Sequence, residues 1–255
     1  MTKTAAPLPW LDAGADFPSV RSAWGKGDPA PGLLAAGAVL DVSTLLRAYS
    51  HGIFPWFSDG QPILWWSPDP RMVLQTGQFK LHRSLRKSIK RFMDDAECEI
   101  RIDSSFEQVI NACAKKSRTG QPGTWILPSM VTAYIALHKA GHAHSVETWV
   151  SGELAGGLYC VNVGGMVFGE SMFAHQTDAS KIALSALIAF CRTYSITMID
   201  CQQNTGHLAS LGAFEISQAD FSTHLLRTVG SAAPTWRFEP VYWNEILQIR
   251  TTSLP

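Results

Sequence analysis

Two apolar runs of the sequence each contain a carboxylate, and this feature constrains the fold more than any other. Glu170 lies within residues 167–173 (VFGESMF), and Asp200 lies within residues 199–202 (IDCQ). Both runs have the composition of buried strands, where a charged group costs free energy unless it is paired or used. Because alternate residues of a strand face the same side, Asp200 and Gln202 should point together. We therefore expect neighbouring strands whose three polar side chains share one site; the alternative is a structural hydrogen-bond network.

The remaining pattern predicts an α+β fold with a meander of strands in its middle. Alternating apolar residues and the turns between them predict strands near these positions: 97–102, 143–150, 154–163, 165–173, 197–201 and Trp236. Helical spacing and capping residues predict helices over these segments: 42–50, 79–92, 104–116, 128–141, 178–194 and 218–228. Residues 1–32 are rich in proline and glycine and are predicted to be irregular.

A proline-rich segment over residues 55–70 separates a small N-terminal part from a larger remainder. Prolines at this spacing exclude a helix. A stiff loop would therefore present several aromatic side chains and Arg71, either to contact a ligand or to anchor the loop in the core. We expect two domains, residues 1–75 and residues 76–255.

The charge of the chain is balanced, with 21 basic and 21 acidic side chains, so no global positive field points to a nucleic-acid partner. Any RNA contact must depend on a local patch. The densest patch is the polar face of the helix predicted over 79–92, which holds these residues: Lys80, Arg83, Arg86, Lys87, Lys90 and Arg91. Such a face is either simply solvated or in contact with phosphates.

Several familiar sites are missing from the sequence. Neither the phosphate-binding loop GxxxxGK(S/T) nor the nucleophile turn GxSxG occurs, and His142 and His144 have no clear third ligand nearby for zinc. The five cysteines form no CxxC pair, which indicates free thiols in a reducing compartment. The N-terminus lacks the apolar core of a secretory signal, and no stretch approaches 18 apolar residues. We expect a cytoplasmic protein with no membrane span, metal ion or cofactor.

A set of short motifs gives the sequence a specific resemblance. In chain order the motifs are GIFPWF, ILWWSPDPR, GTWI, GHAHSVE, FGESMF, ASK, IDCQ and HLASLGA. In this order and spacing they resemble the leucyl/phenylalanyl-tRNA–protein transferase family, over about residues 32–213. The resemblance implies a small N-terminal domain and a C-terminal GNAT-like acyltransferase domain with a mixed, mainly antiparallel sheet. It also implies transfer of Leu, Phe or Met from aminoacyl-tRNA to the N-terminal Lys or Arg of an acceptor protein, which marks that protein for bacterial N-degron proteolysis.

The resemblance assigns roles to individual positions. Asp200 and Gln202 match the pair that the family assigns to catalysis, and Glu170 matches the acid beside the amino-acid pocket. Trp56 and Trp125 match tryptophans that contact the 3′ adenosine of the tRNA. The other substrate-binding positions are Leu158, Leu184 and Leu187 in the pocket wall, with Ile199 and Asn204. The phosphates of the acceptor stem would contact Arg83, Lys87, Lys90 and Arg91.

The implied chemistry is aminolysis of an ester. Because the ester is already activated, the reaction needs no ATP or metal, and roughly a tenth to a fifth of the acceptor α-amine is neutral at pH 7. Holding amine and ester in line, worth roughly 7 to 11 kcal/mol, should dominate over base assistance of about 10² to 10⁴-fold. We expect Asp200 to polarise or orient Gln202, whose carbonyl holds the amine, while water or the tRNA terminal hydroxyl relays the proton. Glu170 and Glu147 are the candidates to bind the acceptor's basic side chain.

Two other functions fit parts of the sequence. A small-molecule N-acyltransferase that uses acyl-CoA would need a glycine-rich pyrophosphate turn, which residues 173–179 lack. A non-catalytic module that binds RNA or peptide ends would account for the nine tryptophans and the basic helix, but not for a buried Asp200 and Gln202. The equal numbers of acidic and basic side chains are compatible with a monomer, which is the state we expect.

Overall fold

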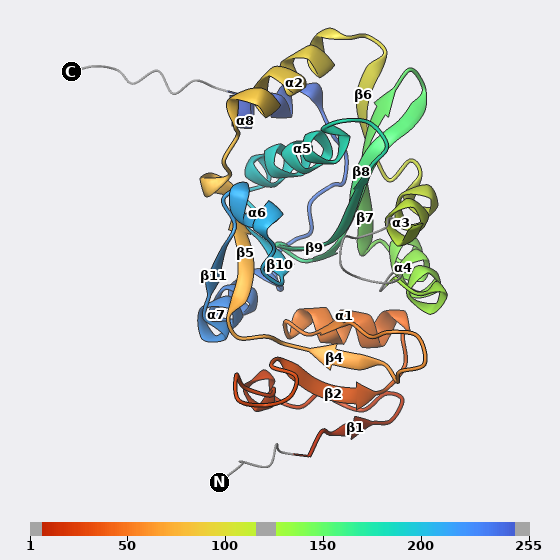
Figure 1. Ribbon diagram of the computed structural model, residues 1–255, viewed down its shortest axis with the longest axis vertical. Helices are drawn as coiled ribbons and strands as arrows, with labels where there is room; N and C mark the ends of the chain where they lie inside the picture. The colour runs from red at the N-terminus through yellow and green to blue at the C-terminus, as the bar shows by residue number, and fades with distance from the viewer. Residues whose placement is uncertain (1–6, 116–125, 248–255) are drawn as a thin grey trace, which may run out of the picture.

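The computed structural model describes residues 7–115 and 126–247, which form two sheets (Figure 1). The smaller sheet has the order β1-β2-β4-β3 and consists of β1 (Trp10–Leu11), β2 (Leu33–Gly37), β4 (Leu64–Trp66) and β3 (Phe54–Pro55). The larger sheet consists, in spatial order, of β11 (Phe214–Ile216), β5 (Arg71–Gln75), β10 (Met198–Gln202), β9 (Met166–Ala174), β8 (Glu153–Val163), β7 (Ala143–Val150) and β6 (Cys98–Ile102). The chain therefore has the predicted α+β fold, with a small N-terminal domain and a larger C-terminal one.

The larger sheet is mixed and mainly antiparallel. Strands β6, β7, β8 and β9 form an antiparallel meander, and β10 then pairs parallel to β9. The connection from β9 to β10 is α5 (Ala179–Thr193), and β5 closes against β10 in antiparallel pairing. This arrangement confirms the predicted meander and agrees with the acyltransferase domain that the resemblance implied.

Helices cover both faces of the larger sheet (Figure 1). α5 packs on β7 and β8 together with α2 (Arg83–Asp94), and α3 (Phe106–Lys115) and α4 (Pro128–Lys139) pack on the opposite face. The remaining helical elements are the short turns η1 (Val20–Ser22), η2 (Thr76–Gln78) and η3 (Pro240–Trp243), with α6 (Gly206–Ser210), α7 (Gln218–Thr228) and α8 (Asn244–Leu247). Within the described segments, none of the helices has the length and apolar character needed to cross a membrane.

The helix predicted over residues 42–50 is confirmed as α1 (Val42–Ser50), which lies between the two sheets (Figure 1). Asp41 caps it, because its Oδ1 accepts the backbone N–H of Thr44 at 2.7 Å. The chain leaves the helix through Gly52, whose φ of +74° suits glycine. A Cβ at Gly52 would lie 2.8 Å from the ring of Phe221, so any larger residue would also collide with α7.

The strand β5 corrects the expected domain division. The sequence placed residues 71–75 in the N-terminal domain, but they pair with β10 and β11 in the larger sheet. The proline-rich segment before β5 is likewise not a free loop. Trp65 is fully buried and donates from Nε1 to the carbonyl of Gly37 at 3.0 Å, and Arg71 is also fully buried. The interpretation as an anchor in the core therefore holds for these two side chains.

Two predicted elements differ from the structure. α2 begins at Arg83 instead of residue 79, because the backbone before it is not helical: ψ is 123° at Phe79 and 151° at His82. The strand predicted near Trp236 is wrong. Pro234 and Pro240 remove backbone donors on either side, and Trp236 packs its ring instead on His144 and Phe190, at centroid distances of 4.0 and 4.6 Å.

Candidate functional site

The site lies where β9 and β10 part from each other. Their parallel register pairs Ile199 with Val167 and Asp200 with Phe168, and ends there. Each strand also has an irregularity just beyond: β9 where it faces β8, and β10 between Asp200 and Gln202 where it faces β5. A bulge of this kind redirects the following side chain. Glu170 and Gln202 therefore meet where β10 ends beside the middle of β9.

Glu170 accepts hydrogen bonds from three side chains. Its Oε1 accepts the Tyr49 hydroxyl at 2.8 Å and Nε2 of Gln202 at 2.9 Å, and its Oε2 accepts the Tyr134 hydroxyl at 3.4 Å. The two tyrosine hydroxyls also lie within hydrogen-bonding distance of each other, so their two protons are shared among three contacts. Tyr49 comes from α1 of the N-terminal domain and Tyr134 from α4, so three parts of the fold converge on one carboxylate.

The surroundings of Glu170 raise its pKa into the neutral range. Its pKa is raised to about 7: burial is the largest cause and the nearby charge of Asp200 adds to it, while the hydrogen bonds from Tyr49, Gln202 and Tyr134 oppose the rise. Burial and the adjacent carboxylate also raise the pKa of both tyrosines well above the usual range. Glu170 is thus the group at this site that can change protonation near pH 7, while the tyrosines remain donors.

Asp200 is held by Arg71 in the interior. Nε and Nη2 of Arg71 donate to Oδ1 and Oδ2 of Asp200 at 2.8 and 2.6 Å, and both side chains are fully buried. Oδ1 also accepts the backbone N–H of Gln202 at 2.9 Å. The expectation of one shared site therefore holds directly for Glu170 and Gln202, whereas Asp200 reaches Gln202 through the backbone and not through its amide.

The positions predicted for the pocket wall lie together. Leu158, Leu184, Leu187 and Ile199 are all buried in one apolar cluster, which also contains much of α5. Tyr49, Tyr134 and Phe168 belong to a second cluster that includes residues of α1, α3 and α4. The predicted apolar wall and the tyrosines that bind Glu170 are therefore parts of two separate packed groups.

The other predicted substrate contacts are scattered. Trp56 is half-buried in the N-terminal domain, with its ring 5.4 Å from that of Trp66. Trp125 lies outside the described residues. Asn204 is exposed on the segment after β10 and donates to Glu215 at 3.0 Å, so it does not join the Glu170 network.

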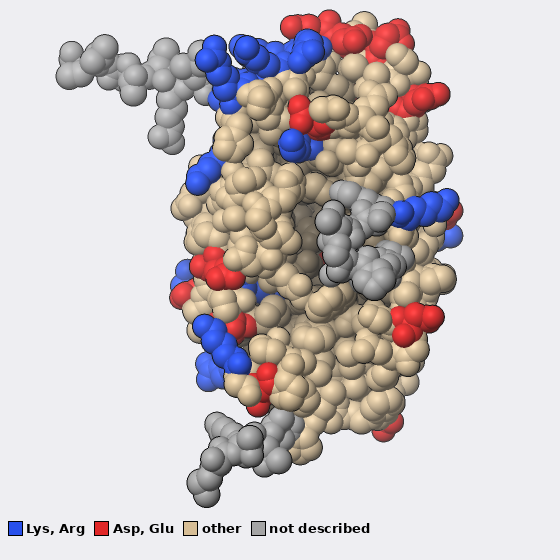
Figure 2. Space-filling view, in the orientation of Figure 1, with Lys and Arg blue, Asp and Glu red and all other residues tan. Residues whose placement is uncertain are grey.

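The predicted phosphate contacts lie on the outer face of α2. Arg83, Lys87, Lys90 and Arg91 are all exposed there, and Lys and Arg side chains gather at this end of the molecule (Figure 2). Arg86 is different, because it donates to the backbone carbonyl of Leu247 at 3.0 Å and ties α2 to α8. We call the four exposed residues the basic face of α2.

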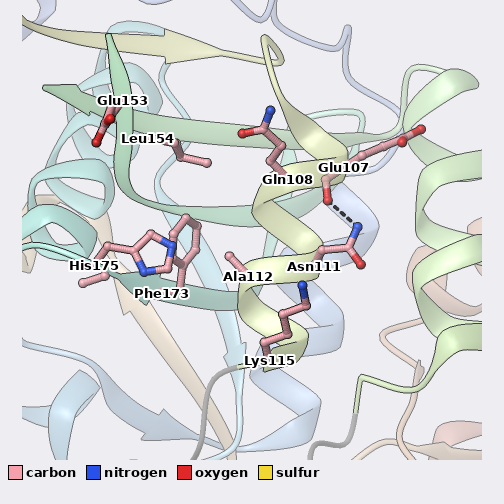
Figure 3. A pocket seen from close by; sticks show the side chains of 10 residues that line it. Glu107, Gln108, Asn111, Ala112, Lys115, Glu153, Leu154, Phe173 and His175 are labelled. Atoms are coloured by element: carbon pink, nitrogen blue, oxygen red, sulfur yellow. Dashed lines mark hydrogen bonds between the residues drawn. The ribbon is translucent and has the colours of Figure 1, made fainter. Parts of the chain in front are cut away.

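A cavity of about 950 Å³ opens between α3 and the adjoining ends of β8 and β9 (Figure 3). It is lined by Glu107, Gln108, Asn111, Ala112, Lys115, Glu153, Leu154, Phe173, Ala174 and His175. Phe173 follows Glu170 by three residues on β9, so the cavity flanks the same strand that carries the acid. It is large enough for a substrate fragment of drug size.

Glu147, the other acid considered for the acceptor's side chain, is fully buried and already bonded. It accepts the backbone N–H of Ser105 at 2.8 Å, the Ser145 hydroxyl at 2.7 Å and Nε1 of Trp149 at 2.9 Å, and it also contacts the Ser104 hydroxyl. It thereby fixes the backbone at the start of α3.

Sequence reasoning missed Tyr49 and Tyr134 as parts of the site, and it placed Arg71 on a loop without connecting it to Asp200. Arg71 carried a usable signal, since a lone arginine stands immediately before the apolar run Met72-Val73-Leu74. The tyrosines had none beyond their position on the inner faces of two helices, because the partner carboxylate is 121 and 36 residues away in the sequence.

Comparison with known proteins gives consistent results. A family model described as "Leucyl/phenylalanyl-tRNA protein transferase" matches residues 73–226, and a second, described as the N-terminal domain of that transferase, matches residues 38–69. A protein of Polaromonas sp. (strain JS666) named leucyl/phenylalanyl-tRNA–protein transferase is 68% identical over the whole of both chains. One of the same name from Albidiferax ferrireducens is 61% identical over 97% of each chain. A solved structure of a GCN5-related N-acetyltransferase from Kribbella flavida matches over 66% of this chain and 58% of that one, at 11% identity and a TM-score of 0.33.

Proposed function

The chain belongs to the leucyl/phenylalanyl-tRNA–protein transferase family, and we propose that this aminoacyltransferase moves Leu, Phe or Met from aminoacyl-tRNA to an N-terminal Lys or Arg. The acceptor is a protein or peptide, and the product carries a new N-terminal residue that directs it to bacterial N-degron proteolysis. We place the reaction in the cytoplasm and the enzyme as a monomer. The observation that carries the proposal is the contact between Glu170, in the middle of β9, and Gln202, at the end of β10.

The reaction forms one bond and breaks another. The α-amine nitrogen of the acceptor attacks the ester carbonyl carbon, and the new peptide bond replaces the ester bond to the terminal ribose. The amine loses a proton, and the departing ribose hydroxyl gains one. Because the donor is an ester, most of the acceleration comes from holding the two reactants in line.

Gln202 is proposed to hold the attacking amine. Its Nε2 donates to Glu170, which leaves the carbonyl oxygen of the same amide as the atom that can accept an amine N–H. An amide is a feeble base, so Gln202 orients the amine instead of taking its proton. Asp200 supports this arrangement through the Gln202 backbone.

We propose that Glu170, when it is ionised, fixes the orientation of the Gln202 amide. As a carboxylate it can accept from Gln202 and from the hydroxyls of Tyr49 and Tyr134, which also contact each other. Of the two acids considered for the acceptor's basic side chain, Glu170 is the one at the site, since Glu147 is bonded at the start of α3.

The donor substrate is proposed to be bound in three places. The apolar cluster around Leu158, Leu184, Leu187 and Ile199 accommodates the aminoacyl side chain, which is not branched at Cβ. Trp56, with Trp125, stacks on the terminal adenosine. The basic face of α2 contacts phosphates of the acceptor stem without reading sequence.

A single assay tests the proposal against its rivals. The enzyme is incubated with radiolabelled Leu-tRNA, unlabelled acetyl-CoA and a peptide that begins with Arg. Label on the peptide supports the transferase, whereas acetylation of the peptide from acetyl-CoA supports the small-molecule acyltransferase. Binding of tRNA without either product supports a non-catalytic module.

A further inference from the structure

The ion pair between Arg71 and Asp200 ties the start of β5 to the end of β10. Two separate nitrogens of the guanidinium bond to the two carboxylate oxygens, at 2.8 and 2.6 Å, and neither side chain is exposed. A two-point contact of this kind fixes the orientation of both groups as well as their distance. In a buried position, the loss of one partner leaves the other charge uncompensated.

Arg71 is also held from the sides by aromatic rings. The guanidinium carbon lies 4.9 Å from the ring centroid of Phe54 in β3 and 4.6 Å from that of Phe221 in α7. Its Nη1 is buried without a hydrogen-bond partner among the described residues. The planar fork of an arginine fits this setting, and a lysine ammonium cannot reproduce its two parallel bonds.

Asp200, held by Arg71, in turn binds the backbone of Gln202. Its Oδ1, already bonded to Arg71, accepts the Gln202 N–H at 2.9 Å. Gln202 has a φ of +58°, in the left-handed region that non-glycine residues rarely occupy. It also follows the irregularity in the pairing of β10 with β5. The carboxylate therefore stabilises the local conformation that turns the Gln202 amide toward Glu170.

We infer that Arg71 is a positioning residue for the transfer reaction, which acts by holding Asp200 so that the Gln202 amide stays against Glu170. On this reading Asp200 is a fixed anion that shapes the turn and does not take the proton of the attacking amine, because both of its oxygens are engaged by Arg71 and the Gln202 N–H. The inference rests on the proposed transfer reaction and assigns Arg71 no contact with substrate.

The test separates kcat from KM in the variant Arg71→Lys, with labelled Leu-tRNA and an Arg-peptide as substrates. We expect kcat to fall about 10-fold or more, while KM for each substrate stays within about 3-fold, since the loss is one of alignment and not of binding. The matched control is Arg192→Lys. Arg192 donates to the carbonyl of Thr76, beyond the other end of β5, at 2.9 and 2.6 Å. That variant should lower the thermal midpoint and leave kcat within about 2-fold.

A second pair of variants keeps the test decisive if Arg71→Lys does not fold. Asp200→Asn preserves shape, and Arg71→Met with Asp200→Asn removes both charges together. Because Arg71 acts through Asp200, the double variant should have the kcat of Asp200→Asn within about 2-fold. Three results would overturn the inference: a folded Arg71→Lys enzyme with wild-type kcat, additive losses in the double variant, or losses that follow the thermal midpoint in the Arg71 and Arg192 variants alike. Absence of transfer by the wild-type enzyme would instead overturn the proposed function.

Discussion

Gln202 donates from Nε2 to Oε1 of Glu170 at 2.9 Å, which joins the end of β10 to the middle of β9 across 32 residues of sequence. This bond decides which way the amide faces. With its nitrogen turned to the carboxylate, its carbonyl oxygen is presented to the acceptor amine. The same bond makes the protonation state of Glu170 a determinant of the geometry.

The first prediction concerns the Gln202 amide itself. Gln202→Ala should lower kcat for transfer of Leu from Leu-tRNA to an Arg-peptide by about 100-fold or more, because the amine loses its acceptor and its orientation. The control is Gln203→Ala, since Gln203 is the exposed neighbour on the same segment. Turnover of Gln202→Ala at the wild-type level would remove Gln202 from the mechanism.

The second prediction concerns the pH dependence of the rate. The pKa of Glu170 is raised to about 7, and the carboxylate accepts more strongly from Gln202 than the neutral acid does, so the rate should fall as the pH drops through 7. The acceptor amine must also lose a proton, with a reference pKa of about 7.7 to 8.0. Below pH 6.5 a plot of log kcat/KM against pH should therefore have a slope of about 2 for the wild type and about 1 for Glu170→Gln. Equal slopes would show that Glu170 does not need to be ionised.

The third prediction concerns stability and follows from the same shift. The folded-state pKa of Glu170, about 7, lies above its usual value of 4.5, so the folded protein binds the proton more tightly than the unfolded chain does. The resulting stability is complete below pH 4.5 and is lost as the pH rises through 7. Relative to Glu170→Gln, the free energy of unfolding of the wild type should fall by about 2 to 3 kcal/mol between pH 4.5 and pH 8. Urea unfolding of both proteins across this range measures it, and parallel curves would contradict the shift.

The fourth prediction concerns the basic face of α2. Reversing Lys87 and Lys90 to Glu should weaken tRNA binding and reduce the dependence of log Kd on log salt, because fewer counterions are released. The control reverses Lys26 and Lys139, which are exposed elsewhere on the molecule, and so keeps the change in net charge equal. Equal effects of the two double variants would indicate a general field instead of a local contact.

The fifth prediction concerns the aminoacyl side chain. We take the cluster around Leu158, Leu184, Leu187 and Ile199 as the wall of the aminoacyl pocket. The shape of such a pocket should favour Leu over its isomer Ile, and apolar pockets distinguish similar side chains by about 1 to 3 kcal/mol. Transfer from Leu-tRNA should thus exceed transfer from Ile-tRNA by about 10- to 200-fold in kcat/KM. Competition between the two labelled tRNAs measures the ratio directly, and comparable rates would reject this wall.

Local patterns predicted much of the fold. The alternation over residues 143–173 identified β7, β8 and β9, and the capping and spacing of α1, α5 and α7 identified those helices within one or two residues. These elements are fixed by side-chain periodicity and end signals, which are properties of short segments. The irregularities in β9 and β10 are not visible in such patterns, and they direct Asp200 and Gln202 to different partners.

The candidate site shows the same division. Glu170, Asp200 and Gln202 could be singled out because polar residues interrupt apolar strands. The partner of Asp200 could not, because Arg71 is 129 residues away and only the pairing of β5 with β10 brings the two together. The strand prediction near Trp236 was wrong for a related reason. Its aromatic character indicated a strand, but its ring packs on His144 and Phe190.

The bond from Tyr49 to Glu170 crosses from one domain to the other. Exchanging the N-terminal domain between relatives would therefore affect the site in the other domain. A chimera that takes every residue before β5 from another family member would bring a new helix α1 against the old acid, and a shift of that hydroxyl would retune the acidity of a group on the far side of the graft. The acidity of Glu170 is therefore a joint property of the two domains.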